Sequence, residues 1–285
     1  MDRASLAAEG ARVLARAAAA GRVDAPDPLR EAWRLLEAVT GIPLGRLQAD
    51  PRRPAERDEQ VRFRAALLRR ARGEPLAWIA GRAAFHAIEV ECGPGVLVPR
   101  PESELLVERL LACLSSAPAR ILDLGTGSGC LLLALLHARP AWQGLGVDRS
   151  PAALQRARRS ARALGLLGRA RFFQGDWAEA LAEGAFDGAV ANPPYVVPGE
   201  PLGPGVAEWE PDEALFTPPR DPLAPYRSVA AGARRALRPG GWLVVETAAG
   251  RGTAVAEVLG ARGFRGLRVH RDLAGHERAV EGRCP

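Results

Sequence analysis

The spacing of apolar positions changes along the 285-residue chain, and each change marks a different kind of structure. In residues 1–72, apolar side chains recur at the period of an amphipathic helix. Asp27 followed by Pro28 is a typical helix start, and Gly41 is a typical helix end. We therefore expect a small helical bundle over residues 1–72. Its apolar positions are Leu6, Val13, Leu14 and Ala17; Leu29, Trp33, Leu36 and Val39; and Val61, Ala65 and Leu68.

Residues 73–98 lose this period, because glycine and proline divide them into short apolar pieces. They predict a linker that contains a β-hairpin. Over residues 99–285, strands alternate with helices, which predicts an α/β domain built on a parallel sheet with helices on both faces. The expected strands are 121–124, 145–148, 170–174, 186–191, 242–246, 264–270 and 278–282. The expected helices are 129–138, 151–164, 225–237 and 253–261.

The composition, with 47% hydrophobic and 25% charged residues, is that of a soluble globular protein. The N-terminal segment is rich in alanine, but Glu9, Arg12 and Arg16 interrupt it, which argues against a signal peptide. We expect a cytoplasmic protein with reduced thiols; import into mitochondria is the alternative. The cysteines show neither a paired metal spacing nor a disulfide framework, and the histidines are scattered, so we expect no metal site.

Positive charge is concentrated in the helical region. The chain has no lysine, and its 39 basic side chains are all arginine, for a net charge of +6. Residues 1–72 hold 15 arginines against 10 acidic residues, whereas the remaining residues hold 24 against 23. Such an excess favours an acidic partner, either a protein or a nucleic acid. A solvated, arginine-rich helix surface would look the same.

Three of the expected strands end in residues that suit a nucleoside ligand. The first leads into a glycine-rich turn that opens a helix, where the backbone can approach a ligand closely and an anion is favoured. The second ends in Asp148, which could accept hydrogen bonds from ribose hydroxyls. The third is followed by Asp176 and Trp177, which suit the amine and the flat face of adenine. Together they predict a site for an adenosine that carries a carboxylate or a phosphate, although turns capped by aspartates would look similar. The candidate residues are Asp123, Gly125, Thr126, Gly127, Ser128, Gly129, Asp148, Asp176 and Trp177.

Asn192 is the only asparagine of the chain. It begins the sequence Asn-Pro-Pro-Tyr over residues 192–195, directly after the fourth expected strand. Asn-Pro also favours turns, so an ordinary turn is the alternative. Because the carboxyl ends of parallel strands meet at one edge of a sheet, we expect Asn192 to face the same site as the adenosine.

The motif Asp-Leu-Gly-Thr-Gly-Ser-Gly of residues 123–129 together with Asn-Pro-Pro-Tyr resembles the Rossmann-like methyltransferases that use S-adenosylmethionine and act on planar nitrogens. The closest resemblance is to the family that methylates the side-chain amide of glutamine in peptide chain release factors. Residues 98–104 (Val-Pro-Arg-Pro-Glu-Ser-Glu) and 272–278 (Asp-Leu-Ala-Gly-His-Glu-Arg) also fit that family. The agreement runs from about residue 73 to residue 282. The chain departs from the family pattern at Trp78, Ser103, Ser160 and Arg251, all outside the two chemical motifs.

The resemblance implies a class I methyltransferase domain, S-adenosylmethionine as methyl donor, S-adenosylhomocysteine as product and no metal. It assigns the loop Gly125–Gly129, Asp148, Trp177 and Asn192 to the methyl donor. It assigns residues 192–195 to the target glutamine. Asp123 and Asp176 are added on the strand-end argument alone.

Methylation of an amide explains why these residue types are needed. The nitrogen lone pair is delocalised, so the NH2 group has to be held by both hydrogens with its lone pair aimed at the methyl carbon. The Asn192 side-chain oxygen can accept one hydrogen and the Pro193 carbonyl the other, because proline has a fixed φ and no competing N–H. Pro194 belongs to the same motif that holds the substrate, and Tyr195 can pack its ring on the flat amide. We therefore expect Asn192, Pro193 and Tyr195 to be catalytic, without a histidine base, a metal or a covalent intermediate.

The same residues also fit other functions. Asn-Pro-Pro-Tyr also serves enzymes that methylate exocyclic amines of DNA or RNA, and a related group methylates a ribosomal protein. A binding module that has lost catalysis is a third possibility. Residues 98–104 favour the release factor as substrate over nucleic acid. We expect a monomer that does not bind membranes, with residues 1–72 docking the release factor.

Overall fold

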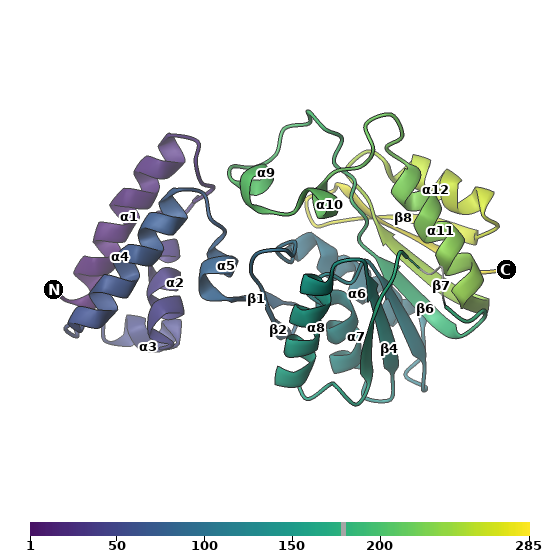
Figure 1. Ribbon diagram of the computed structural model, residues 1–285, viewed down its shortest axis with the longest axis horizontal. Helices are drawn as coiled ribbons and strands as arrows, with labels where there is room; N and C mark the ends of the chain where they lie inside the picture. Colours follow the sequence, from purple (N-terminus) through teal and green to yellow (C-terminus); the bar gives the residue numbers. More distant parts are fainter. Residues whose placement is uncertain (178–180) are drawn as a thin grey trace. The chain divides into compact units, whose positions relative to one another are not determined.

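The computed structural model describes residues 1–177 and 181–285. Contacts within the chain divide it into two compact units (Figure 1). The first unit comprises Met1–Arg82, Cys92–Pro94 and Pro201–Glu210. The second comprises Ala83–Glu91, Gly95–Glu200 and Pro211–Pro285.

The first unit is helical, as the apolar spacing predicts. Asp27 caps its second helix by accepting a hydrogen bond from the Arg30 backbone N–H at 2.9 Å, and Pro28 is the first helical residue. Gly41 ends that helix with a φ of 70°, which glycine adopts without strain. The helices are α1 (Arg3–Ala19), α2 (Pro28–Thr40), α3 (Leu44–Ala49), α4 (Arg57–Ala71), α5 (Leu76–Ala80) and α9 (Val206–Trp209).

The prediction of which face of α4 is buried is wrong. Val61 and Leu68 are 60% and 58% exposed, whereas Phe63 and Leu67 are buried in the core of the bundle. Both sets of residues have helical spacing, so the period alone could not separate them. The packing separates them, because a side chain on Gly10 of α1 would come within 2.7 Å of the Phe63 ring. Because α1 packs so closely against Phe63, the face of α4 that carries Phe63 is the one that faces the core.

The expected hairpin forms from β1 (Arg82–Phe85) and β2 (Ile88–Glu91). The short helix α5 before it was not expected. Pro75 precedes this helix and Gly81 ends it with a φ of 73°, so it has too few residues to show a helical period.

The second unit contains a seven-stranded sheet in the order β5-β4-β3-β6-β7-β9-β8. The prediction of a parallel sheet is correct for β3 to β7 and wrong for β9, which runs antiparallel to both of its neighbours. Only residues 272–276 join β8 to β9, and a parallel connection needs a much longer crossover. The strands are β3 (Arg120–Leu124), β4 (Gln143–Asp148), β5 (Ala170–Gln174), β6 (Phe186–Ala191), β7 (Leu237–Glu246), β8 (Arg265–Arg271) and β9 (Glu277–Arg283). The helices are η1 (Pro101–Ser103), α6 (Glu104–Cys113), α7 (Cys130–Ala138), α8 (Pro151–Ala163), α10 (Asp212–Leu215), α11 (Ala224–Ala236) and α12 (Gly252–Ala261).

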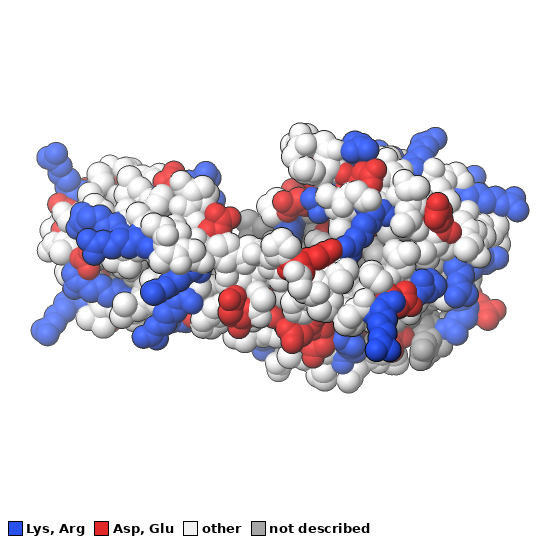
Figure 2. Space-filling model, turned by 90° about the horizontal axis from the view of Figure 1, so that it is seen from above, with Lys and Arg blue, Asp and Glu red and all other residues white. Residues whose placement is uncertain are grey.

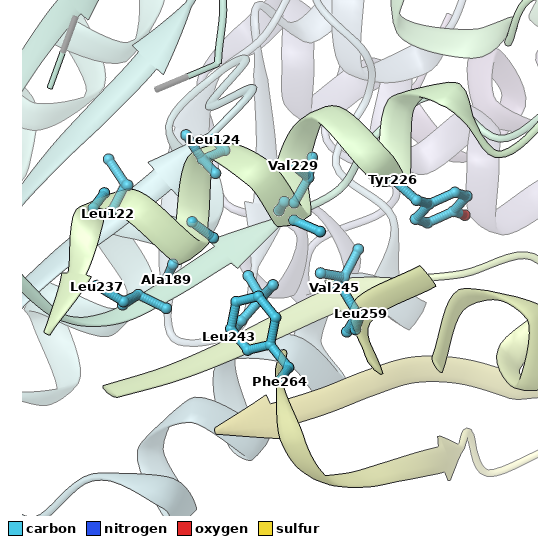
Figure 3. Packing of buried hydrophobic residues seen from close by; sticks show 14 of the residues in the cluster. Leu122, Leu124, Ala189, Tyr226, Val229, Leu237, Leu243, Val245, Leu259 and Phe264 are labelled. Carbon is cyan, nitrogen blue, oxygen red and sulfur yellow. The ribbon is translucent and has the colours of Figure 1, made fainter. Parts of the chain in front are cut away.

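Helices cover both faces of this sheet, as predicted (Figure 1). Successive residues of β3 enter different cores: Leu122 packs with α11 and α12, whereas Ile121 packs with α6 and α7. Figure 3 shows the first of these cores, in which Tyr226 and Val229 of α11 lie in the same cluster as Leu243 and Val245 of β7. A sheet buried on both sides holds its strand ends rigidly, which is the property that a site at those ends requires.

No helix within residues 1–177 and 181–285 is both long enough and apolar enough to cross a membrane.

Candidate active site

The residues predicted to form the site leave the sheet from one edge. Leu124 of β3 pairs with Val147 of β4 and with Ala191 of β6, and Ala191 pairs with Val245 of β7. These four residues form one row across the sheet, so the residues that follow them begin at a common edge. The residues that follow are Gly125, Asp148, Asn192 and Glu246.

The glycine-rich turn needs its glycines for two reasons. Gly125, Gly127 and Gly129 have φ values of 74°, 55° and 83°, in the left-handed region that other residues enter at a cost. A side chain on Gly129 would also meet the Cβ of Ala157 at 3.1 Å, so glycine lets the start of α7 pack against α8. The hydroxyl-bearing residues between the glycines, Thr126 and Ser128, are buried.

Asp148 fixes this turn from the neighbouring strand. Its carboxylate accepts hydrogen bonds from the backbone N–H of Gly127 and of Ser150, both at 2.8 Å. Burial raises the pKa of Asp148 above its usual value, although these two bonds oppose the shift. A carboxylate has about four acceptor positions, so two remain for the hydroxyl groups of a ligand.

Asp123 lies beneath the turn and is fully buried. One of its oxygens, Oδ2, accepts a hydrogen bond from the Thr126 hydroxyl at 2.6 Å and another from the Leu132 N–H at 3.3 Å. Within the described residues, the other oxygen, Oδ1, is buried without a hydrogen-bond partner. Burial raises the pKa of Asp123 to about 7. An unpaired buried acceptor of this kind fits a site that is completed by a ligand with a donor group.

Trp177 lies beside the glycine turn, since a side chain on Gly125 would come within 3.6 Å of the Trp177 ring. The Trp177 backbone has a φ of 48°, which is uncommon for a residue with a side chain. Asp176, predicted to act with it, lies between β5 and Trp177. In the part of the chain that the structure describes, the Asp176 carboxylate forms no hydrogen bond or ion pair with the other predicted site residues.

Asn192 is joined by hydrogen bonds to a series of polar side chains. Its Nδ2 donates a hydrogen bond to Ser103 Oγ at 3.2 Å, and Ser103 Oγ donates to Glu246 Oε2 at 2.5 Å. The hydroxyl of Tyr195 donates to the other oxygen of Glu246 at 3.4 Å. Of the two prolines in the motif, Pro193 is buried and Pro194 is partly exposed. The structure thus joins two ends of the Asn-Pro-Pro-Tyr motif through one carboxyl group.

Ser103 and Glu246 are members of this network that the sequence analysis did not single out as site residues. Glu246 ends β7 and is 1% exposed, and burial raises its pKa to about 7. Burial likewise raises the pKa of Tyr195 to about 12, so its hydroxyl keeps its proton and acts as a donor. Glu246 could have been found by the same strand-end rule that pointed to Asp148. Ser103 has no such signal, because it comes from a short helix far away in the sequence.

Several contacts also hold the backbone after Asn192 in place. The Arg251 guanidinium donates to the Tyr195 carbonyl at 2.6 Å and forms an ion pair with Glu200. Val196 forms a parallel bridge with Phe216. Arg251, one of the departures from the family pattern, therefore takes part in shaping the loop that carries Tyr195.

The buried carboxyl of Glu246 should make stability depend on pH. Its pKa is about 7 in the folded chain and 4.5 as the ordinary value, so the folded state holds its proton more tightly. That contribution to stability is fully present below pH 4.5 and is lost as the pH rises through about 7. Between about pH 5 and pH 8, the wild type should lose more unfolding free energy than the Glu246→Gln variant. Urea unfolding of both proteins at several pH values measures this; parallel curves would contradict it.

No group of three or more histidine, cysteine, aspartate or glutamate side chains within the described residues is arranged to hold a metal ion.

Two models of known protein families match parts of this chain. One, described as a methyltransferase domain, matches residues 115–265. The other, described as the PrmC N-terminal domain, matches residues 8–81. The chain therefore has the class I fold of methyltransferases that depend on S-adenosylmethionine, together with an N-terminal helical domain.

Whole-chain relatives point the same way. A release factor glutamine methyltransferase of Rhodospirillum rubrum is 42% identical over 90% of this chain and 79% of its own. One from Cereibacter sphaeroides is 40% identical over 98% of this chain and 99% of its own. Among solved structures, a 16S rRNA N2 G1207 methyltransferase of T. thermophilus in complex with AdoMet and guanosine matches with a TM-score of 0.52. The two sequences are 25% identical. The match covers 72% of the present chain and 50% of the rRNA methyltransferase.

Proposed function

Since the chain belongs to the release factor glutamine methyltransferase family, we propose that it transfers a methyl group from S-adenosylmethionine to the side-chain amide nitrogen of a glutamine in a peptide chain release factor. The observation that carries this proposal is the position of Asn192. It leaves β6 at the edge from which the glycine turn leaves β3, so a methyl donor and a planar amide can be held next to each other.

The residues at this edge fit S-adenosylmethionine. A side chain on Gly127 would meet nothing within 4 Å, so the glycine turn leaves room near the start of α7 for an anionic group such as a carboxylate. Asp148 keeps acceptor positions for ribose hydroxyls, and the Trp177 ring beside Gly125 offers a flat apolar surface for adenine. The unpaired Oδ1 of Asp123 is an acceptor for an ammonium group, directly or through a water molecule. When bound, S-adenosylmethionine supplies a methyl group that is activated by a positively charged sulfur.

The Asn-Pro-Pro-Tyr residues hold the glutamine. Asn192 Oδ1 accepts one hydrogen of the substrate NH2, and the Pro193 carbonyl accepts the other, which aims the nitrogen lone pair out of the amide plane. The Tyr195 ring packs against that plane. Positive charge develops on the nitrogen during transfer, and these two fixed carbonyl dipoles stabilise it without having to reorganise. Positioning supplies much of the remaining acceleration.

The test is methylation of purified release factor with labelled S-adenosylmethionine, followed by mass spectrometry of the modified peptide. We expect one methyl group on a glutamine side chain. Two parallel reactions, with ribosomal protein and with ribosomal RNA, cover the competing substrates. The RNA arm is needed because the rRNA methyltransferase shares the fold at 25% identity. Methylation of RNA with no reaction on the release factor would overturn the proposal.

We propose that the helical residues 1–72 dock the release factor and that residues 73–98 connect them to the methyltransferase domain of residues 99–285. The positive charge of residues 1–72 supports this role, and Figure 2 shows several arginine side chains on the face of the helical unit that it draws. An acidic surface on the partner would be attracted to them. Nucleic acid is disfavoured as a partner, and the enzyme is expected to act as a monomer in the cytoplasm.

Removal of residues 1–72 tests the docking role. We expect the KM for full-length release factor to rise by about tenfold or more, since each 1.4 kcal/mol of lost binding is a factor of ten. The KM for a short peptide that contains the glutamine should change little, because the peptide reaches only the catalytic edge. Steady-state kinetics on both substrates measure this, and calorimetry with S-adenosylmethionine checks that the truncated protein is folded. An unchanged KM for the full-length factor would contradict the docking role.

A further inference from the structure

The proposed function needs one particular orientation of the Asn192 side chain. Its carboxamide has an acceptor, Oδ1, and a donor, Nδ2, on opposite branches of nearly the same shape. Only Oδ1 can accept a hydrogen from the substrate NH2. If the group were turned over, two donors would face each other and the substrate would be repelled. Something must therefore fix which branch of Asn192 points at the substrate.

The hydrogen bonds around Ser103 provide that control. A serine hydroxyl has one hydrogen, and Ser103 gives it to Glu246 Oε2 at 2.5 Å. Toward Asn192, Ser103 can then only accept, so Asn192 must turn its Nδ2 to Ser103, as it does at 3.2 Å. Within the described residues, no hydrogen bond reaches Asn192 Oδ1, which is left to accept from another molecule. The direction of both hydrogen bonds, from Asn192 to Ser103 and from Ser103 to Glu246, therefore follows from Glu246 being an acceptor.

We propose that Ser103 and Glu246 are positioning residues that orient Asn192, and that the negative charge of Glu246 sets the direction of the hydrogen-bond chain. This inference rests on the proposed function for its catalytic consequence, whereas the orientation itself is a property of the protein alone. When Glu246 is protonated, it can donate to Ser103. Ser103 can then donate to Asn192 Oδ1, and the carboxamide is free to turn over.

The groups around Glu246 come from several elements. Arg278 of β9 favours its charged form, and so do the hydrogen bonds from Ser103 and Tyr195. Glu102 of η1 opposes the charge, and Tyr226 of α11 and Cys130 of α7 are the other titratable groups whose pKa values respond to Glu246. Burial outweighs these partners and raises the pKa of Glu246 to about 7. The carboxyl group is therefore charged above that pH and neutral below it, and activity should fall as the pH decreases through about 7.

Because Asn192 is the only asparagine, protein made with [15N]asparagine has a single side-chain NH2 group to observe by NMR. We expect its two proton signals to shift with pH, with one midpoint given by the titration of Glu246. That midpoint should vanish in Glu246→Gln, which cannot ionise, and remain in Asp123→Asn, a control for the other carboxyl whose pKa is about 7. In Ser103→Ala, the signals should become insensitive to the state of Glu246.

Activity measurements give the second readout. The Glu246→Gln variant should lose the acidic limb of the pH profile of kcat, because glutamine can accept from Ser103 or donate to it at any pH. The Ser103→Ala variant should lose about two- to tenfold in kcat, the range for one hydrogen bond. The Ser103→Thr variant keeps the hydroxyl and should restore kcat. Calorimetry with S-adenosylmethionine shows whether each variant is folded.

The two readouts separate the two claims. A wild-type protein that does not methylate the release factor would refute the proposed function, and the NMR titration would still decide the orientation of Asn192. Asn192 signals that ignore both pH and the Ser103→Ala change would overturn the inference. An acidic limb that persists in Glu246→Gln would overturn the role of the charge.

Discussion

Replacement of Asn192 by alanine should lower kcat for release factor methylation by about 10²- to 10³-fold, the range found when one preorganised polar group is removed from a transition state. Alanine has no acceptor for the substrate N–H, so the lone pair of the amide nitrogen is no longer aimed at the methyl carbon. The glycine turn and Asp148 do not depend on Asn192, and binding of S-adenosylmethionine should persist with at most a modest loss. Single-turnover kinetics and calorimetry measure the two effects separately.

Gln143→Ala is the matched control for this experiment. Gln143 also carries a side-chain carboxamide, but it begins β4 at the opposite edge of the sheet and is exposed. Its loss should leave both kcat and donor binding unchanged. Wild-type turnover in Asn192→Ala would remove Asn192 from the reaction, and an equal loss in both variants would mean that the assay reports folding.

Much of the fold could be predicted because local signals agree with the final structure. Helix α2 begins at Asp27 and Pro28 and ends at Gly41 as expected, and β6 has the predicted bounds of Phe186–Ala191. The errors occur where a local pattern allows two answers. Both faces of α4 have helical apolar spacing, and only the contact of Phe63 with α1 decides between them. The direction of β9 depends on the length of the turn before it.

The site could be predicted only in so far as strand ends converge. That rule placed Asp148 and Asn192 at one edge, as their register shows. It did not reveal that Asn192 contacts Ser103, which lies 89 residues earlier, or that Ser103 contacts Glu246, 143 residues later. No periodicity links residues so far apart, because their contact depends on how η1 packs against the sheet. The sequence therefore points to Asn192 as the proposed acceptor for the substrate NH2, and the fold determines which branch of its carboxamide faces the substrate.

Asp148→Ala should raise the Kd for S-adenosylmethionine by about 10- to 10²-fold, since a hydrogen bond to a charged group is worth about 1.5–3 kcal/mol. Two losses combine in this variant. The ribose hydroxyls lose their carboxylate acceptor, and the Gly127 N–H loses the bond of 2.8 Å that holds the glycine turn in place. At saturating donor, kcat should fall much less, because Asn192 and Pro193 still hold the amide. Calorimetry gives the Kd, and kinetics at several donor concentrations give kcat.

Asp187→Ala separates this effect from a general loss of structure. Asp187 also accepts a hydrogen bond from a backbone N–H, that of Arg120 at 2.6 Å, and it pairs with Arg238. It lies near the start of β6, at the edge of the sheet away from Asn192. Its removal should lower Tm and leave the Kd for the methyl donor unchanged. If Asp148→Ala binds the donor as tightly as the wild type, then Asp148 serves the turn alone and the ribose is recognised elsewhere.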